Sequence, residues 1–448
     1  MKHDTNAVFE KGLKLHHYAN TAYPLDGKKV WSEFKIRDNV DLAVEKQWSN
    51  VSELGLYVHI PFCKKRCLYC EYAVLSGDES NLQEEYLSLL LDEISFYNKI
   101  MKGKSAVGLD IGGGTPTIMH VTNLEKIISA VLETYNKTPD FGMSIETTPI
   151  IANDLEKMKA IRNIGFKRIS MGVQTINPKL LEEVGRTDSS LEIVKRARDN
   201  IREAGFEKFN IDLMYGFAHE SLESFVSTVK FAVSLNPEYI TLYRNRFKGT
   251  KLEDQAKFVT LEQVNEFYQA AWNLLVGSGY SANNGKNTFS RISNDPGTSA
   301  YLTRRVIDGT PYLGMGLGSQ SMGDSSIYYN QGAASKKIGG YRQLVNEGHF
   351  PVQDIYVIPK DEIMAKMISV SFYFGYINKT SFEKKFGLTL ENHFTDELDF
   401  LLKHDLMEHS GELFALTKKG KEVVNGIIPL FYSERSKDNL LTKVVPNV

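Results

Sequence analysis

Residues 57–72 read YVHIPFCKKRCLYCEY and contain Cys63, Cys67 and Cys70, the only three cysteines of the chain. Thiolates are the protein ligands of iron–sulfur clusters, and a cubane cluster normally takes four of them. A C-x3-C-x2-C loop can bind three of the irons, and the chain has no fourth cysteine for the last one. The spacing therefore predicts a [4Fe-4S] cluster with one iron open to a small chelating molecule.

A zinc site and three unrelated thiols are the alternatives for this loop. Structural zinc sites use four closed ligands, often as two separated C-x2-C pairs. The chain has no second pair, and His59 alone does not replace it. Ligand count and spacing favour the cluster.

Strand-like and helix-like stretches alternate between residue 54 and about residue 285. Strands are expected to begin near residues 54, 106, 143, 166, 209 and 238, with helical stretches between them. This alternation indicates an α/β fold with a parallel sheet built of βα units. In such folds functional side chains collect at the carboxyl ends of the strands.

Composition excludes several classes of protein. Hydrophobic residues make up 42% and charged residues 24%, which is ordinary for a globular protein, and the net charge of −2 attracts neither nucleic acid nor an acidic membrane. We find no signal peptide and no run of about 18 apolar residues that would span a membrane. Cysteines used as reduced ligands indicate a cytoplasmic protein.

The cysteine loop resembles the cluster-binding signature of the radical S-adenosylmethionine (SAM) enzymes, and the flank YVHIPFC resembles that of the oxygen-independent coproporphyrinogen III oxidase family. The resemblance implies a partial (β/α)6 barrel of the TIM type, followed by a mainly helical, winged-helix-like domain. It also implies that the amine and carboxylate of SAM chelate the open iron. One electron, from a donor such as flavodoxin or ferredoxin, then releases a 5′-deoxyadenosyl radical that removes a hydrogen atom from an unactivated carbon.

The resemblance assigns roles to further residues at strand ends. It places Gly113, Gly114 and Thr115, in the GGGTP turn, against the methionine amine of SAM. Carboxylate, amide and guanidinium groups that follow later strands suit the amine, ribose hydroxyls and carboxylate of the same cofactor; these are Glu146, Gln174, Arg186 and Asp212. Each residue has a structural alternative, as a tight turn or as a polar side chain that satisfies a strand end.

Aromatic residues flank the cysteines. The resemblance places Tyr57 at the sulfonium, as the candidate catalytic side chain, and Tyr72 near the adenine, whereas Tyr69 would shield the cluster. Core packing is the alternative for each tyrosine. Some family members bind a second SAM molecule, for which Tyr243 and the stretch 314–318 are the candidates here.

The sequence suggests four segments. Residues 1–50 form an N-terminal arm, in which Tyr23 and Pro24 resemble a family segment over the barrel mouth. Residues 51–285 form the barrel, and residues 286–351 form a barrel extension with loops. Residues 352–448 form the C-terminal helical domain. Basic residues are few in its winged-helix-like part, residues 406–428, which favours a structural or lid role over DNA binding.

Two departures from the family direct the functional prediction. The decarboxylating oxidases have another cysteine two positions after the triad, where this chain has Tyr72, and the haem chaperones have a His-Asn-x-x-Tyr-Trp motif that residues 281–291 lack. We therefore expect radical chemistry on another small molecule, a tetrapyrrole or other conjugated ring, with C-methylation or a related ring modification as the lead. Coproporphyrinogen oxidation and haem binding stay open as alternatives.

Overall fold

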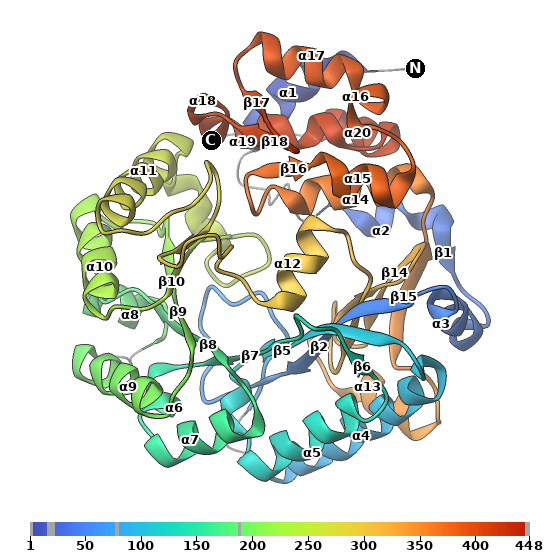
Figure 1. The fold of residues 1–448 in the computed structure, drawn as a ribbon, viewed down its shortest axis with the longest axis vertical. Coiled ribbons are helices and arrows are strands. Elements are labelled where there is room, and N and C mark those ends of the chain that lie inside the picture. Colours follow the sequence, from blue (N-terminus) through green and yellow to red (C-terminus); the bar gives the residue numbers. More distant parts are fainter. Residues whose placement is uncertain (1–2, 16–22, 77–79, 187–189, 444–448) are drawn as a thin grey trace.

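Six parallel strands form the centre of the molecule (Figure 1). The structure is a computed structural model that describes residues 3–15, 23–76, 80–186 and 190–443. The six strands pair in chain order, each parallel to the next; they are β2 (Glu53–Ile60), β5 (Ser105–Gly113), β7 (Met143–Thr147), β8 (Arg168–Gln174), β9 (Lys208–Tyr215) and β10 (Tyr239–Arg244). The partial (β/α)6 barrel expected from the sequence is confirmed.

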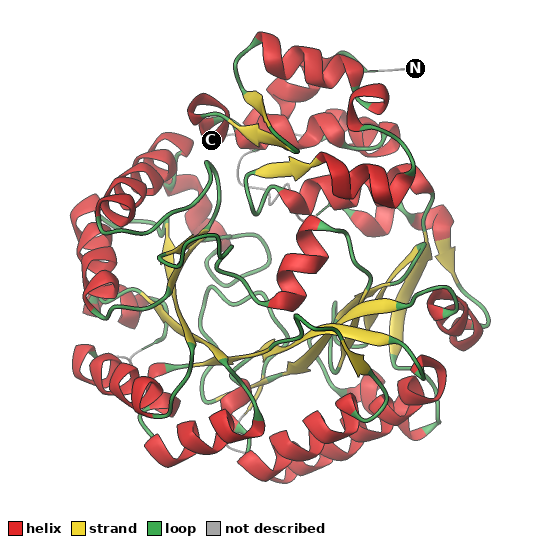
Figure 2. Cartoon of the chain, viewed as in Figure 1, coloured by secondary structure: helices red, strands yellow, loops and turns green. Residues whose placement is uncertain are grey.

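Helices cover the outer face of these strands (Figure 2). They are α4 (Ser80–Met101), α5 (Val121–Leu132), α7 (Leu155–Ile164), α9 (Leu191–Glu203), α10 (Leu222–Ser234) and α11 (Leu261–Gly277). In α5 the buried residues Leu124, Ile127, Ile128 and Val131 recur at helical spacing and form one apolar stripe. The strands are buried along most of their length because side chains cover both of their faces.

The sheet continues beyond the barrel on both sides. On one side β12 (Tyr312–Met315) runs parallel to β2, and the next strands follow antiparallel; they are β13 (Gln320–Met322), β14 (Ser326–Asn330), β15 (Val352–Val357) and β1 (Lys35–Ile36). On the other side β11 (Thr288–Ser290) pairs antiparallel with β10.

Residues 286–351 therefore contain strands where the sequence favoured loops, and the predicted helical region begins with β15. These strands are short, so their pairing partners determine their conformation more than their own pattern does. The segment boundaries remain a proposal.

The C-terminal part has its own apolar core and a winged-helix-like outline. Its strands are β16 (Tyr376–Asn378), β17 (Met407–Ser410) and β18 (Leu413–Leu416), of which the last two form an antiparallel hairpin. Its helices are α14 (Lys360–Ser371), α15 (Lys379–Phe386), α16 (Leu390–His393), α17 (Thr395–Lys403), α18 (Lys418–Glu422), α19 (Val424–Ile427) and α20 (Glu434–Thr442).

The N-terminal arm packs on this C-terminal part. Helix α1 (Thr5–Lys14) contacts α19 and α20. Tyr23 is buried, and its hydroxyl lies 3.0 Å from Ser433 Oγ and also bonds to Glu362. Trp31 Nε1 donates to the same carboxylate at 2.9 Å. Tyr23, which the resemblance placed over the barrel mouth, thus lies in the core of the C-terminal part. Within the described ranges, no helix is both long and apolar enough to cross a bilayer.

Helix α12 (Ala300–Ile307) lies inside the ring of strands (Figure 1) and contacts β2 and β5. Tyr301 at its start packs against two strand glycines: a Cβ on Gly55 would come within 2.5 Å of its ring, and a Cβ on Gly108 within 2.6 Å of its backbone nitrogen. The Tyr301 ring also stacks on Tyr57, with centroids 6.3 Å apart and an interplanar angle of 24°. The helix therefore fills the barrel interior beside the first halves of β2 and β5, and so closes the interior below the carboxyl ends of the strands.

We expect Gly108→Ala to destabilise the protein by about 1–3 kcal/mol, because the added methyl group would overlap backbone that cannot move without displacing α12. Gly142→Ala is the matched control, since its Cβ would meet the same helix start only at 3.9 Å, from the Ala300 methyl. Urea unfolding of both variants measures the difference. Equal stability of the two would show that α12 is not held by this contact.

Candidate active site

The carboxyl ends of the barrel strands surround a single cavity of about 530 Å³. Every residue expected at the cluster and at the first SAM lines it; the set comprises Tyr57, Cys63, Cys67, Cys70, Tyr72, Gly113, Gly114, Thr115, Glu146, Gln174, Arg186 and Asp212. These residues come from five strands and from the loops that follow them, and the parallel arrangement brings them together. Their individual roles remain proposals.

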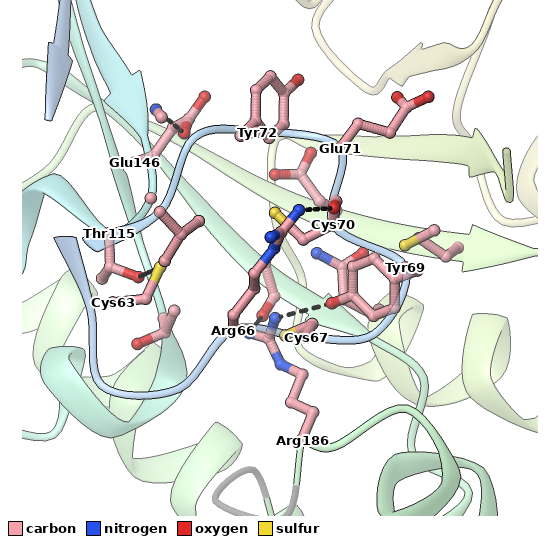
Figure 3. Close-up of a pocket in the computed structure, with 18 of the residues that line it drawn as sticks. Cys63, Arg66, Cys67, Tyr69, Cys70, Glu71, Tyr72, Thr115, Glu146 and Arg186 are labelled. Atoms are coloured by element: carbon pink, nitrogen blue, oxygen red, sulfur yellow. Dashed lines mark hydrogen bonds between the residues drawn. The ribbon is translucent and has the colours of Figure 1, made fainter. Parts of the chain in front are cut away.

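The cysteine loop, residues 61–75, is held at several points. Leu75 N donates to Pro61 O at 2.7 Å, so the loop closes on itself at its base. Leu68 N donates to Val184 O at 3.0 Å, and Arg66 Nη2 donates to Cys70 O at 3.0 Å within the loop. Figure 3 shows the three cysteines distributed along this loop, with Cys63 beside Thr115 and Cys67 beside Tyr69 and Arg186.

The three thiols are partly buried and form no disulfide. Burial raises the pKa of Cys63 to about 11, and burial also raises the pKa of Cys70. Cys63 Sγ lies 3.6 Å from Thr115 Oγ1. Since a metal ligand must be a thiolate, iron binding here would displace protons.

The donor set of the loop fits a cubane cluster. In the described part of the chain, no three His, Cys, Asp or Glu side chains group as ligands of a single metal ion. A cubane places its thiolates on different irons, so it does not need them to converge on one point. If a cluster is bound, Cys63, Cys67 and Cys70 would hold it.

The GGGTP turn packs directly against the cysteine loop. A Cβ on Gly114 would lie 2.5 Å from Phe62 O and 3.0 Å from Cys63 Sγ. Gly113 has a φ of +119°, and a Cβ there would lie 2.6 Å from the His59 ring. Gly114 N and Thr115 N donate to backbone oxygens at the base of the loop, at 2.9 and 2.7 Å. The glycines thus permit a backbone contact that fixes the thiols relative to β5.

Glu146, at the end of β7, has a carboxyl group that faces the cavity and is exposed to it (Figure 3). Gly113 N donates to its Oε2 at 3.1 Å. Desolvation by the surrounding cavity walls, and then the nearby Asp212, raise the pKa of Glu146 to about 8. A cationic ligand would supply the missing stabilisation, so the group suits an ammonium.

Gln174 and Arg186 form a second polar group on the cavity wall. Gln174 has a φ of 69° at an irregularity of β8, and its buried Oε1 has no hydrogen-bond partner among the described residues. Arg186 Nη1 donates to Tyr69 OH at 3.1 Å, and its Nη2 donates to Gly172 O. Strained backbone and an unsatisfied buried oxygen together are typical of ligand sites.

Asp212 differs from Glu146 because side chains of the protein already donate hydrogen bonds to both of its carboxylate oxygens. Ser170 Oγ and Asn210 Nδ2 donate to its two oxygens, each at 2.7 Å. Burial raises its pKa, whereas these hydrogen bonds lower it. An additional donor such as a hydroxyl group would use the remaining lone pairs. Gln174, Glu146 and Asp212 therefore form a set of acceptors that fits the amine and hydroxyls of SAM.

Two tyrosines frame the cavity beside the loop. Tyr57 OH lies 3.3 Å from His59 Nδ1, and burial lowers the pKa of His59 to about 4, so this imidazole is neutral at pH 7. Tyr72 lines the cavity with 58% of its surface exposed. Both rings are placed to contact a planar group.

The sequence analysis missed several residues that line the cavity. Arg244 is the last residue of β10, Arg246 follows this strand, and Tyr373 comes from the C-terminal part. The two arginines stand at a strand end with one residue between them, which is a signal that the sequence carries. Tyr243 lines the cavity, whereas residues 314–318, the other part of the suggested second SAM site, are not part of its described lining. Instead, Gly316 N donates to the buried Glu93 at 2.8 Å.

Comparison with known proteins agrees with this architecture. Residues 57–232 match the family model of the radical SAM superfamily. The chain is 27% identical to an oxygen-independent coproporphyrinogen III oxidase of Escherichia coli over 396 residues, 84% of this chain and 85% of that protein. It is 26% identical to the haem chaperone HemW of Bacillus subtilis over 394 residues, 84% of this chain and 99% of that protein. A solved structure of coproporphyrinogen III oxidase (HemN) from E. coli, described as a radical SAM enzyme, superposes with a TM-score of 0.75 at 25% identity, covering 89% of this chain and 95% of that one.

We expect Cys67→Ser to abolish the cubane signature of protein reconstituted anaerobically with iron and sulfide, because the loop has no spare thiol. Electron paramagnetic resonance and Mössbauer spectroscopy measure the signature. Met214→Leu is the matched control, since it removes another cavity-lining sulfur that is not expected to bind iron. A Cys67→Ser protein with an unchanged spectrum would contradict the assignment.

Proposed function

Since this chain belongs to the radical SAM superfamily, we propose that it binds a [4Fe-4S] cluster and SAM and uses them to modify a planar, conjugated small molecule. The observation that carries the proposal is that three thiols, the carboxyl group of Glu146 and an unsatisfied buried amide oxygen line one cavity. When bound, the two cofactors supply a carbon radical able to remove a hydrogen atom from an unactivated carbon.

The residues of the chain have separate tasks in this proposal. Cys63, Cys67 and Cys70 hold the cluster. Glu146 accepts a hydrogen bond from the amine of SAM, and Arg186 receives its carboxylate. Gln174 and Asp212 accept hydrogen bonds from its hydroxyl groups, whereas Gly113, Gly114 and Thr115 let the backbone approach the cofactor closely. Their common effect is to fix the cofactor relative to the substrate and to exclude water from the reactive carbon.

The aromatic lining supports a planar substrate. Tyr57 and Tyr72 flank the cysteines, and Tyr243 and Tyr373 line the same cavity from β10 and from the C-terminal part. Offset stacking on such rings favours a flat conjugated molecule over an aliphatic one. A tetrapyrrole has this shape, and the relatives of this chain have names that refer to porphyrinogen and haem.

C-methylation or a related ring modification is the lead reaction. The resemblance leads us to expect a further cysteine two positions after the triad in a decarboxylating oxidase. This chain has Tyr72 at that position. Methylation requires a methyl donor, so it involves a second SAM molecule, for which the region around Tyr243 is the candidate. The electron is supplied by a reduced donor such as flavodoxin or ferredoxin.

Two alternatives have observations in their favour. Oxidative decarboxylation of coproporphyrinogen III is supported by the TM-score of 0.75 to the E. coli oxidase. Haem binding without turnover is supported by the alignment with HemW, which covers 99% of that protein.

The nucleoside products separate the reaction types. With reductant, SAM and a porphyrin substrate, we expect the anaerobically reconstituted protein to form both 5′-deoxyadenosine and S-adenosylhomocysteine, since methyl transfer consumes the cofactor in two ways. Mass spectrometry measures both. 5′-Deoxyadenosine alone, with vinyl groups formed from coproporphyrinogen III, would establish the oxidase instead. Stoichiometric haem binding with neither product would establish the chaperone.

Binding of SAM is expected to strengthen as pH rises from 6 to 8. Below pH 8 the Glu146 carboxyl group is largely protonated, because its pKa is raised to about 8, and it must lose that proton to accept the hydrogen bond from the amine as a carboxylate. The expected slope is up to about tenfold in affinity per pH unit, with a plateau above pH 8. Equilibrium binding in cluster-loaded protein measures it, and Glu146→Gln is expected to remove the slope.

Glu220→Gln is the matched control for this titration. Burial also raises the pKa of Glu220 to about 8, but this carboxyl group is not part of the cavity lining. The control should keep the slope of the unmodified protein. If Glu220→Gln flattens the profile and Glu146→Gln does not, the role given to Glu146 is wrong.

A further inference from the structure

Arg168, the first residue of β8, extends its guanidinium group into the barrel interior without lining the cavity. Its Nη1 donates to Ser144 Oγ of β7 at 3.0 Å, and its Nη2 donates to Gly297 O at 3.3 Å. The guanidinium carbon also lies 5.6 Å from the centroid of the Tyr239 ring. Among the described residues, its anchors are therefore a hydroxyl, a carbonyl and an aromatic ring, and none of them neutralises its charge.

The strand register places this guanidinium group one layer below the carboxyl groups of the cavity. Arg168 pairs with Ser144, and two residues further along the same strands Ser170 pairs with Glu146. Residues i and i+2 of a strand share a face and lie about 7 Å apart. Ser170 Oγ in turn donates to Asp212 Oδ2 at 2.7 Å. Arg168 thus stands below Glu146 and Asp212 at the same time.

A third carboxyl group shares the layer of Arg168. Asp110 of β5 pairs with Ser144, the residue whose hydroxyl group binds the guanidinium group. Ser299 Oγ donates to Asp110 Oδ2 at 2.6 Å, whereas Oδ1 is buried and has no hydrogen-bond partner among the described residues. Arg168 is the cation that acts on all three carboxyl groups.

These carboxyl groups oppose one another's ionisation. Desolvation raises the pKa of Asp110 to about 6 and that of Glu146 to about 8, and it also raises the pKa of Asp212. The charges of Asp212 and Asp110 raise the pKa of Glu146 further. Arg168 acts in the opposite direction on each group, because a fixed positive charge nearby favours the carboxylate form. The ionisation of the cofactor site near pH 7 therefore depends on a side chain outside that site.

The titratable groups that face Glu146 from the other elements cannot replace this charge. They are all acids, and they come from β2, the cysteine loop, β5, β9 and β10; they are Tyr57, Tyr72, Asp110, Asp212 and Tyr243. Each is neutral or negative, so none favours a carboxylate through its charge. Arg186 acts on Asp212, but it is already assigned to the carboxylate of SAM.

We propose that Arg168 is a positioning residue of the cofactor site, whose fixed charge, anchored by Ser144 below the cavity, keeps Glu146 and Asp212 usable as carboxylates for the amine and hydroxyl groups of SAM. This inference rests on the proposed function and adds to it a residue that does not line the cavity. The role requires a positive charge at this place. A purely structural role would instead require the hydrogen bonds of the guanidinium fork.

Infrared titration and SAM binding in anaerobically reconstituted protein test the proposal. The C=O band of protonated Glu146 is recognised by its absence in Glu146→Gln, and its loss with rising pH gives the midpoint of the titration. In Arg168→Gln we expect this midpoint to rise by about one pH unit, so that SAM binds roughly tenfold more weakly at pH 7. Above the raised midpoint, the affinity should be at least that of the unmodified protein, because the residues that contact SAM are intact.

Two further variants separate charge from structure. Arg168→Lys keeps the charge without the planar fork, so it should keep the midpoint of the unmodified protein within a few tenths of a pH unit, about the precision of such a titration. Arg168→Met is a second neutral variant, and it should raise the midpoint as Arg168→Gln does. It carries the test if the glutamine variant does not fold.

Arg202→Gln is the matched control, because Arg202 has contacts of the same kind outside the barrel. It donates to Asn236 O, and its guanidinium carbon lies 5.5 Å from the centroid of the Phe209 ring. This variant should leave the midpoint and the affinity unchanged.

Three results would overturn the proposal: an unchanged midpoint in the neutral variants, a midpoint in Arg168→Lys as high as theirs, or SAM binding weakened by the same factor at every pH. If the midpoint moves as expected but the unmodified protein binds no SAM, the proposed function fails and the effect of Arg168 on Glu146 stands.

Discussion

The close contact between the cysteine loop and the GGGTP turn is the constraint on which the site depends. A single methyl group on Gly114 would overlap both Phe62 O and Cys63 Sγ. Because the two backbones touch, the thiols have a fixed position relative to β5, and through the bond from Gly113 N relative to Glu146. Metal ligands and cofactor ligands are thereby fixed in one rigid unit, which positional catalysis requires.

The interior of the barrel contains carboxyl groups of raised pKa together with the guanidinium group of Arg168. Asp110, Glu146 and Asp212 are inside, and burial raises the pKa of each of them. His59 is also buried, and burial lowers its pKa, so it contributes no charge at pH 7. Arg168 lies near all three carboxyl groups, and its charge lowers their pKa values against the effect of burial.

The C-terminal part reaches the cavity because its own core is joined to the N-terminal arm. Glu362 of α14 accepts from Trp31 and bonds to Tyr23, so the arm and this helix form one buried network. The same helix ends at Ser371, directly before Phe372 and Tyr373. Contacts between residues far apart in the sequence thus position Tyr373 at the cavity. Arg246 donates a hydrogen bond to Tyr373, so these contacts also orient the arginine.

The sequence by itself predicted a parallel sheet of βα units, and its resemblance to a known family predicted the partial barrel and the residues expected to hold the cofactors. Alternating strands and helices leave one economical arrangement, the parallel βα sheet, and such a sheet gathers its strand ends on one side. The C-x3-C-x2-C loop and the glycine turn were therefore predictable, because each is local in the chain. Only the tertiary structure decided which residues complete the cavity. The strands between residues 286 and 357 are short and take their conformation from their partners. Tyr373 and Arg246 meet although 127 residues separate them, and the burial that shifts the pKa of Glu146 comes from neighbours on other strands. No pattern within a short window can encode such contacts, because they depend on how independent segments pack.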